Sequence, residues 1–197
     1  RRFAQVSHEY LIEQLQFSSY SGTAGADATL ELNFNHPVKE LIWTGGISNE
    51  GLSAVTTGTG RDDGIITVVS GNHPAYYVEQ RLSGDWKLSL NGHDRIKARD
   101  FKYFTRTQVW QHHSGYGGCN NDDSIAVYSF SLKPEEHQPS GTCNFSRIDN
   151  AELTGKYSAD LSGTEGDEQT GKLVFVYAIN YNVLRIMSGM GGLAYSN

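Results

Sequence analysis

The chain has 197 residues and a net charge of −6, from 16 basic and 22 acidic side chains, and 38% of its residues are hydrophobic. This length fits one β domain, since sandwiches and barrels often run to about 200–250 residues as a single unit, and the composition excludes a disordered chain. The acidic balance and the lack of a clustered basic face argue against direct nucleic-acid binding.

The cysteine content, the apolar runs and the first residue further narrow the kind of protein that this chain can be. Cys119 and Cys143 are too few for a disulfide-rich secreted scaffold, so we expect free thiols in a reducing compartment, although one disulfide between them stays open. No apolar run reaches the roughly 18–20 residues that span a bilayer, so we expect no membrane insertion. The chain begins with Arg1, not Met, which predicts an interior piece of a longer polypeptide.

Alternation of apolar and polar residues with a period of two dominates the chain, as is typical of half-buried strands. In chain order it predicts strands at residues 10–17, 28–35, 38–43, 86–91, 125–132 and 173–187, with a weaker one at 148–157. The run 173–187 is apolar on both faces, which predicts a central strand covered on both sides. Two extra strands, 65–69 and 76–82, are expected inside a long loop.

One stretch has a helical pattern. Asp94 is a candidate N-cap for a helix over residues 96–104, in which Phe101 and Phe104 lie three residues apart. The stretches 44–84, 105–124 and 158–171 are rich in Gly, Ser, Thr, Asn and Asp and are predicted as long surface loops.

About eight strands, long loops and one short helix favour an all-β fold, an antiparallel two-sheet sandwich. Periodicity alone does not separate a jelly roll from an immunoglobulin-like sandwich. The latter usually carries a Cys-Trp-Cys arrangement, and here Trp43, Trp86 and Trp110 all precede Cys119. This order favours the jelly roll.

Several long segments make the chain recognisable. They are HPVKELIW (36–43), LNGHDR (90–95), YSFSLKPE (128–135), HQPSGTCNFSRID (137–149), YNVLRI (181–186) and GGLAYSN (191–197). In this order the segments resemble the major capsid proteins of nucleocytoplasmic large DNA viruses, from about residue 9 to the end. The resemblance implies an eight-stranded antiparallel jelly-roll sandwich, the second of two consecutive jelly rolls. Residues 1–8 would then be the linker from a missing N-terminal jelly roll, and residues 9–197 the C-terminal jelly-roll domain.

The resemblance also implies a function. Members of this family form homotrimers with a pseudo-hexagonal outline, which tile an icosahedral shell above an internal viral membrane. We therefore expect a structural capsid protein, assembled in the host cytoplasm, that contacts neighbouring capsomers and minor capsid proteins. No catalytic residue, cofactor or metal is expected.

The residues that we take as the structural motif of this resemblance are His36, Pro37, Trp43, Asn91, Gly92, His93, Asp94, Arg95, His137, Gln138, Pro139, Ser140, Gly141, Asn144, Ser146, Arg147, Asn180, Tyr181 and Asn182. The segment 137–147 is predicted as a rigid corner between the two sheets, with Gly141 at a positive φ. Asn91-Gly92 predicts a tight turn. Arg147 and Asp149, two apart in a stretch expected to be extended, are expected on one face.

Other functions have weaker support. His112, His113 and Cys119 could suggest a metal site, but their spacing lacks further ligands and a polar loop is the better interpretation. Asn144-Phe145-Ser146 matches the N-glycosylation pattern, which we interpret as coincidence. Carbohydrate recognition is the alternative function, with Tyr76, Tyr77 and Tyr116 as candidate residues in predicted loops.

Overall fold

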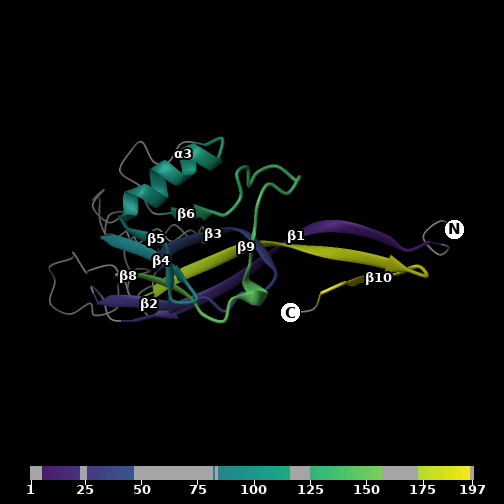
Figure 1. The fold of residues 1–197 in the computed structure, drawn as a ribbon, viewed down its shortest axis with the longest axis horizontal. Helices are drawn as coiled ribbons and strands as arrows, with labels where there is room; N and C mark the ends of the chain where they lie inside the picture. Colours follow the sequence, from purple (N-terminus) through teal and green to yellow (C-terminus); the bar gives the residue numbers. More distant parts are fainter. Residues whose placement is uncertain are drawn as a thin grey trace, which may run out of the picture.

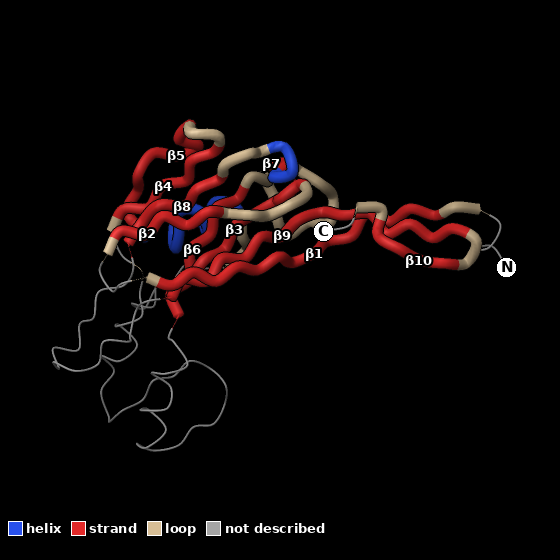
Figure 2. The backbone as a smooth tube through the Cα atoms, turned by 90° about the horizontal axis from the view of Figure 1, so that it is seen from below, coloured by secondary structure: helices blue, strands red, loops and turns tan. Residues whose placement is uncertain are grey.

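The computed structural model describes residues 6–22, 26–46, 82, 84–115, 125–156 and 173–195. These residues form two antiparallel sheets and one short helical segment (Figures 1 and 2). The predictions at 65–69 and 76–82, except for Leu82, and those for Cys119, Tyr76, Tyr77 and Tyr116 lie outside the described residues. No helix among those described is long and apolar enough to cross a membrane.

The larger sheet has the strand order β1-β9-β3-β6. Its strands are β1 (His8–Ser21), β9 (Leu173–Met187), β3 (Pro37–Gly46) and β6 (Ile125–Ser129). Two short strands join it: β10 (Met190–Leu193) pairs with β9, and β7 (Cys143–Asn144) pairs with β3. The strand β9 therefore lies between β1 and β3, which confirms its predicted central position, but it is not covered on both faces, because Phe175, Tyr177 and Ile179 are only half-buried.

The smaller sheet has the strand order β2-β8-β4-β5. Its strands are β2 (Asp27–Glu31), β8 (Ala151–Lys156), β4 (Asp85–Leu90) and β5 (His93–Asp100).

The pairing pattern explains how the chain makes a jelly roll. The strand pairs are nested, as in one long hairpin whose tip is the β4–β5 turn: β1 pairs with β9, β2 with β8, β3 with β6 and β4 with β5. When this hairpin rolls up, successive strand pairs lie in alternate sheets. The predicted all-β jelly-roll sandwich is confirmed.

Aromatic residues fill the space between the sheets. The Trp43 ring lies 6.0 Å from that of Trp86 and 5.0 Å from that of Phe104, and all three side chains are fully buried. Gly155 on β8 makes room for this cluster, because a Cβ there would come within 2.2 Å of the Trp86 ring. The alternation in the sequence thus produces one continuous core, with Trp43 at its centre.

The helix prediction was wrong in position. Residues 93–100 are strand β5, and Asp94 caps no helix. The helical segment spans residues 101–112 and contains a π-helical part, η2 (Tyr103–Thr107), and α3 (Gln108–His112). Asn91 and Gly92 take positive φ values of 51° and 76°, so the chain turns tightly back along β4 and residues 93–100 are recruited into the sheet. Pairing with β4 outweighs the weak helical pattern.

Three further expectations need correction. The strand predicted over residues 125–132 ends at Ser129, and Leu132, beyond its end, is 72% exposed. Residues 145–147 form a 3₁₀ turn, η3 (Phe145–Arg147), so Arg147 and Asp149 do not share a strand face. The predicted loop 105–124 begins with helix, because Phe104 and Gln108 are buried and hold that segment against the sandwich.

Two strands run beyond the sandwich. The first part of β1 and the last part of β9 continue past the smaller sheet as a ribbon, with β10 beside them (Figures 1 and 2). Tyr10 and Leu193 on this ribbon are 46% and 47% exposed. We call this three-stranded extension the arm.

Candidate functional site: a junction where the arm leaves the sandwich

Connections that cross between the sheets meet at one end of the sandwich. One is residues 32–36, between β2 and β3, and the other is residues 130–150, between β6 and β8. Residues 32–37 and 143–150 meet there, next to the 91–92 turn and residues 180–182. We call this place the junction.

His36 and Ser146 join the two crossing connections. The Ser146 Oγ accepts the His36 backbone N–H at 2.8 Å, and the Phe145 N–H donates to the His36 carbonyl at 3.0 Å. His36 has a φ of 67°, a left-handed value that is uncommon for a residue with a side chain. The Asn144 Oδ1 accepts the Ser146 N–H at 3.1 Å and starts the η3 turn. The junction therefore holds a backbone geometry that the isolated chain would not favour.

Asn91 connects the tip of the rolled hairpin to the same place. Its Oδ1 accepts the backbone N–H groups of Asp149 and Asn150 at 2.9 and 3.2 Å, and its own N–H donates to the Asn150 carbonyl at 2.6 Å. One side chain thus satisfies two backbone donors of a segment that has left the sheet.

Amide side chains continue the junction into the larger sheet. Gln16 binds the backbone of Asn35 on both sides, donating to its carbonyl at 2.6 Å and accepting its N–H at 2.9 Å. Gln16 also donates to the Oδ1 of Asn180, which is fully buried, at 3.0 Å. Asn182 donates to the Gln14 Oε1 and to the Tyr195 carbonyl, both at 2.9 Å. These buried or half-buried amides lie on β1 and β9 at the place where the smaller sheet ends and the arm begins.

A bulge in β3 buries two charged residues in succession. The pairing register shifts between Val38 and Glu40, and Lys39 and Glu40 are 3% and 4% exposed. The Lys39 Nζ pairs with the Glu13 carboxylate at 2.7 Å and donates to the Pro134 carbonyl at 2.6 Å. Its Nζ also lies 5.7 Å from the centre of the Tyr181 ring. A bulge lets neighbouring residues break the alternation in this way.

Glu40 binds the end of the helix. Its carboxylate lies 3.1 Å from Nε2 of His113, whose Nδ1 lies 3.2 Å from the Glu135 carboxylate. The contact with Glu40 raises the pKa of His113, burial works against this effect, and Glu135 adds to it. We call Glu40, His113 and Glu135 the histidine clamp, because it ties β3, the helix end and residues 133–136 together.

The predicted corner at 137–147 is confirmed as a crossing between the sheets. His137, Gln138 and Pro139 are exposed, whereas the Ser140 Oγ accepts the Lys133 N–H at 2.9 Å. Gly141 has a φ of 143°, and a Cβ there would lie 2.7 Å from the Phe130 carbonyl oxygen. The expectation of a positive φ at Gly141 is confirmed.

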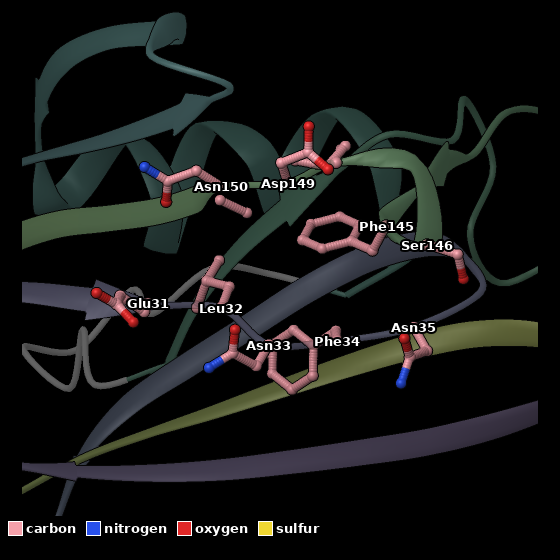
Figure 3. A pocket seen from close by; sticks show the side chains of 11 residues that line it. Glu31, Leu32, Asn33, Phe34, Asn35, Phe145, Ser146, Asp149 and Asn150 are labelled. Atoms are coloured by element: carbon pink, nitrogen blue, oxygen red, sulfur yellow. The ribbon is translucent and has the colours of Figure 1, made fainter.

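A surface hollow of about 490 Å³ opens where the two crossing connections separate (Figure 3). Phe34 and Phe145 line it, with ring centres 6.3 Å apart. Of the polar residues around it, Asn150 donates to the Glu152 carboxylate at 3.0 Å and Ser146 is bound to His36. Polar side chains here hold chain segments together. No group of three or more potential metal ligands occurs among the described residues.

The structure separates the predicted motif residues into groups. Those that meet at the junction are His36, Pro37, Asn91, Gly92, Asn144, Ser146, Asn180 and Asn182. Tyr181 lies beside Lys39, and Trp43 lies in the core. His93, Asp94 and Arg95 lead away along β5, where Asp94 pairs with Lys87 at 3.2 Å, and Arg147 is exposed.

The sequence analysis missed charged and amide side chains that bind chain segments to one another at the junction, at the β3 bulge and in the histidine clamp. These are Glu13, Gln14, Gln16, Lys39, Glu40 and Glu135. The signal for Lys39 and Glu40 is two successive charges inside an alternating strand, which indicates a bulge. His113 was interpreted as part of a polar loop, but it follows α3 directly and belongs to the histidine clamp.

Comparisons with known proteins agree with this geometry. Residues 1–192 match the family described as large eukaryotic DNA virus major capsid protein. The whole chain is 45% identical to part of the major capsid protein of Pyramimonas orientalis virus, covering 45% of that protein. It is 42% identical to that of Paramecium bursaria Chlorella virus 1, covering 50%. The chain thus spans about half the length of these curated relatives.

Solved structures share the fold. The crystal structure of PBCV-1 VP54, fitted into a reconstruction of the virophage Sputnik, matches all of this chain with a TM-score of 0.74 and 37% identity, over 53% of that chain. The Faustovirus major capsid protein matches 91% of this chain and 34% of its own, with a TM-score of 0.60 and 13% identity, which shows the fold alone.

Proposed function

Because the chain belongs to the family of large eukaryotic DNA virus major capsid proteins, we propose that it is one jelly-roll unit of the protein that builds an icosahedral capsid shell. The observation that carries this proposal is a whole jelly roll that aligns over its full length with capsid proteins at 42–45% identity. The relatives are named as capsid proteins and not as enzymes.

The finer proposal concerns domains and assembly. Residues 9–197 form the C-terminal jelly roll of a longer polypeptide, and residues 1–8 link it to an N-terminal one. Three copies of the full-length polypeptide form a pseudo-hexagonal capsomer. Neighbouring capsomers and minor capsid proteins contact it in the virion, above an internal membrane that it does not enter. Assembly takes place in the host cytoplasm.

The junction and the histidine clamp support a structural role without catalysis. Charged groups of the clamp and of the neighbouring bulge in β3 pair with one another, as His113 does with Glu40 and Lys39 with Glu13, and hold chain segments in place. A subunit that must repeat many times in a shell needs a single rigid shape, and buried ion pairs and hydrogen bonds between distant segments favour one arrangement of the chain.

Light scattering coupled to size exclusion tests the oligomeric part of the proposal. The purified full-length polypeptide should have three times its chain mass, and negative-stain images should show a hexagonal outline. A particle that keeps the mass of one chain at high concentration would contradict the proposed capsomer.

A further inference from the structure

Asn91 and Gly92 form a dipeptide that is chemically reactive. It is the only Asn-Gly pair in the sequence, and both residues are exposed in the β4–β5 turn. In such a pair the glycine nitrogen can attack the side-chain amide of the asparagine, because glycine has no side chain that obstructs the approach. The turn therefore exposes a reactive dipeptide to water at a point on which the junction depends.

The reaction is a spontaneous deamidation. The Gly92 nitrogen forms a bond to Cγ of Asn91, the bond from Cγ to Nδ2 breaks, and ammonia leaves with the proton of the Gly92 N–H. Water then opens the resulting succinimide ring. Opening at Cγ gives aspartate, whereas opening at the main-chain carbonyl gives isoaspartate, in which the main chain runs through the former side chain. Water is the only co-reactant.

The junction holds the Asn91 side chain in place. Its Oδ1 accepts the backbone N–H groups of Asp149 and Asn150 at 2.9 and 3.2 Å. Its own N–H donates to the Asn150 carbonyl at 2.6 Å, and its φ of 51° belongs to a turn closed by the pair Leu90 and His93. Closure of the succinimide ring requires rotation about the Cα–Cβ and Cα–C bonds of Asn91. That rotation breaks both side-chain hydrogen bonds, so the folded junction opposes the reaction.

We propose that Asn91-Gly92 is a deamidation site that the folded junction protects, and that isoaspartate at position 91 irreversibly marks a chain whose junction has been open. Isoaspartate adds one atom to the main chain of the turn, so the pairing of Leu90 with His93 and the contacts with residues 149–150 do not form together. Aspartate leaves the main chain unchanged and keeps an acceptor oxygen. The site therefore distinguishes chains that stay folded from chains that have opened.

The β9–β10 turn provides a matched control. Ser188 and Gly189 have φ values of 52° and 81°, close to the 51° and 76° of Asn91 and Gly92, and they also connect two antiparallel strands. Ser188 is exposed, and a Cβ on Gly189 would meet nothing within 4 Å. The turn lies at the far end of the arm, away from the junction (Figure 1). S188N therefore creates a second Asn-Gly pair with the same turn geometry but without the junction.

Peptide mapping by mass spectrometry tests the protection. The folded S188N protein is kept at neutral pH, and deamidation is followed at positions 91 and 188 of the same molecule. Synthetic peptides of residues 88–95 and, with S188N, of residues 185–192 give the unprotected rates. We expect folding to slow the reaction at Asn91 at least about tenfold more than at position 188, because two side-chain hydrogen bonds must break at Asn91 alone. Unfolding in urea should remove this difference.

Two results would overturn the proposal. Equal protection at the two positions would assign the effect to the turn geometry or to folding as a whole. A rate at Asn91 that equals or exceeds the rate of its peptide would show that the bonds from Asp149 and Asn150 do not protect the amide, or that they activate it for attack.

Refolding tests whether the mark is irreversible. The unmodified protein is kept in urea until position 91 is partly converted, then diluted into buffer and separated by size exclusion into folded and aggregated fractions. Endoproteinase Asp-N, which cleaves before aspartate but not before isoaspartate, distinguishes the two products. We expect the folded fraction to contain aspartate at position 91 and to be depleted of isoaspartate several-fold, and we expect N91D to refold as the control. The same ratio of the two products in both fractions would overturn the proposed mark.

Discussion

Gly141 shows how a single residue can fix a chain crossing. Its φ of 143° is strained for any residue with a side chain, and an added Cβ would lie 2.7 Å from the Phe130 carbonyl oxygen. We expect G141A to lower the free energy of unfolding by about 2–4 kcal/mol, from backbone strain plus overpacking. Urea denaturation measures this loss. The matched control is G192A on β10, where a Cβ meets nothing within 4 Å, and a similar loss there would contradict the explanation.

Asn91 tests the junction at the residue scale. N91A removes the acceptor for the Asp149 and Asn150 backbone N–H groups and should cost about 1–2 kcal/mol, since the site is partly accessible to water. N91D keeps both an acceptor oxygen and a residue type that tolerates positive φ, so it should retain most of the stability. Chemical denaturation of both variants gives the comparison; equal losses would assign the effect to the turn alone.

Sequence analysis works unevenly at this scale. Gly141 and the Asn91-Gly92 turn could be predicted, because positive φ has a local signature in the sequence. The hydrogen bond between Gln16 and Asn180 could not be predicted, since the two residues are 164 positions apart in the chain and meet only when β1 and β9 pair. No sequence spacing of amide side chains predicts such a contact.

At the scale of elements, the histidine clamp makes the fold sensitive to pH. Glu40 and Glu135 raise the pKa of His113 above its ordinary value of 6.5, against the effect of burial. A group whose pKa is raised on folding stabilises the fold fully below its unfolded pKa, and this contribution is lost as the pH rises through the folded pKa. The contacts among β3, the helix end and residues 133–136 should therefore weaken at alkaline pH.

The variant H113Q checks this direction. The loss of unfolding free energy relative to the unmodified chain should be larger at about pH 6 than at about pH 9, because only protonated His113 pairs with both carboxylates. H93Q, on the exposed start of β5, is the control and should follow the unmodified chain at both pH values. A loss for H113Q that does not change with pH would show that the ring acts by packing alone.

The elements also show where local patterns fail. The strands β1 and β3 were predicted from alternation and β9 from its long apolar run; β9 buries Val174, Val176 and Ala178, whereas β1 alternates between half-buried and exposed residues. Residues 96–100 were predicted as helix, yet they form an edge strand in which Lys97, Arg99 and Asp100 are charged and exposed. Ile96 is the residue of this strand that packs against the core, which is too weak an apolar face to reveal the strand, and the preceding turn at Asn91 and Gly92 places it in the sheet.

At the scale of the whole molecule, the order of strands in the sheets could be expected only from the family resemblance. Alternation predicts strands, but a jelly roll and other sandwiches share it. The nested pairs from β1–β9 inward to β4–β5 depend on contacts across most of the chain.

The central claim is that this sandwich is a repeated part of a viral shell. Electron cryomicroscopy of the virion, with side chains resolved in the shell, tests it most directly. The account predicts that the two-sheet sandwich, with Trp43 and Trp86 between its sheets, recurs in every capsomer. A shell built without this sandwich would contradict the account.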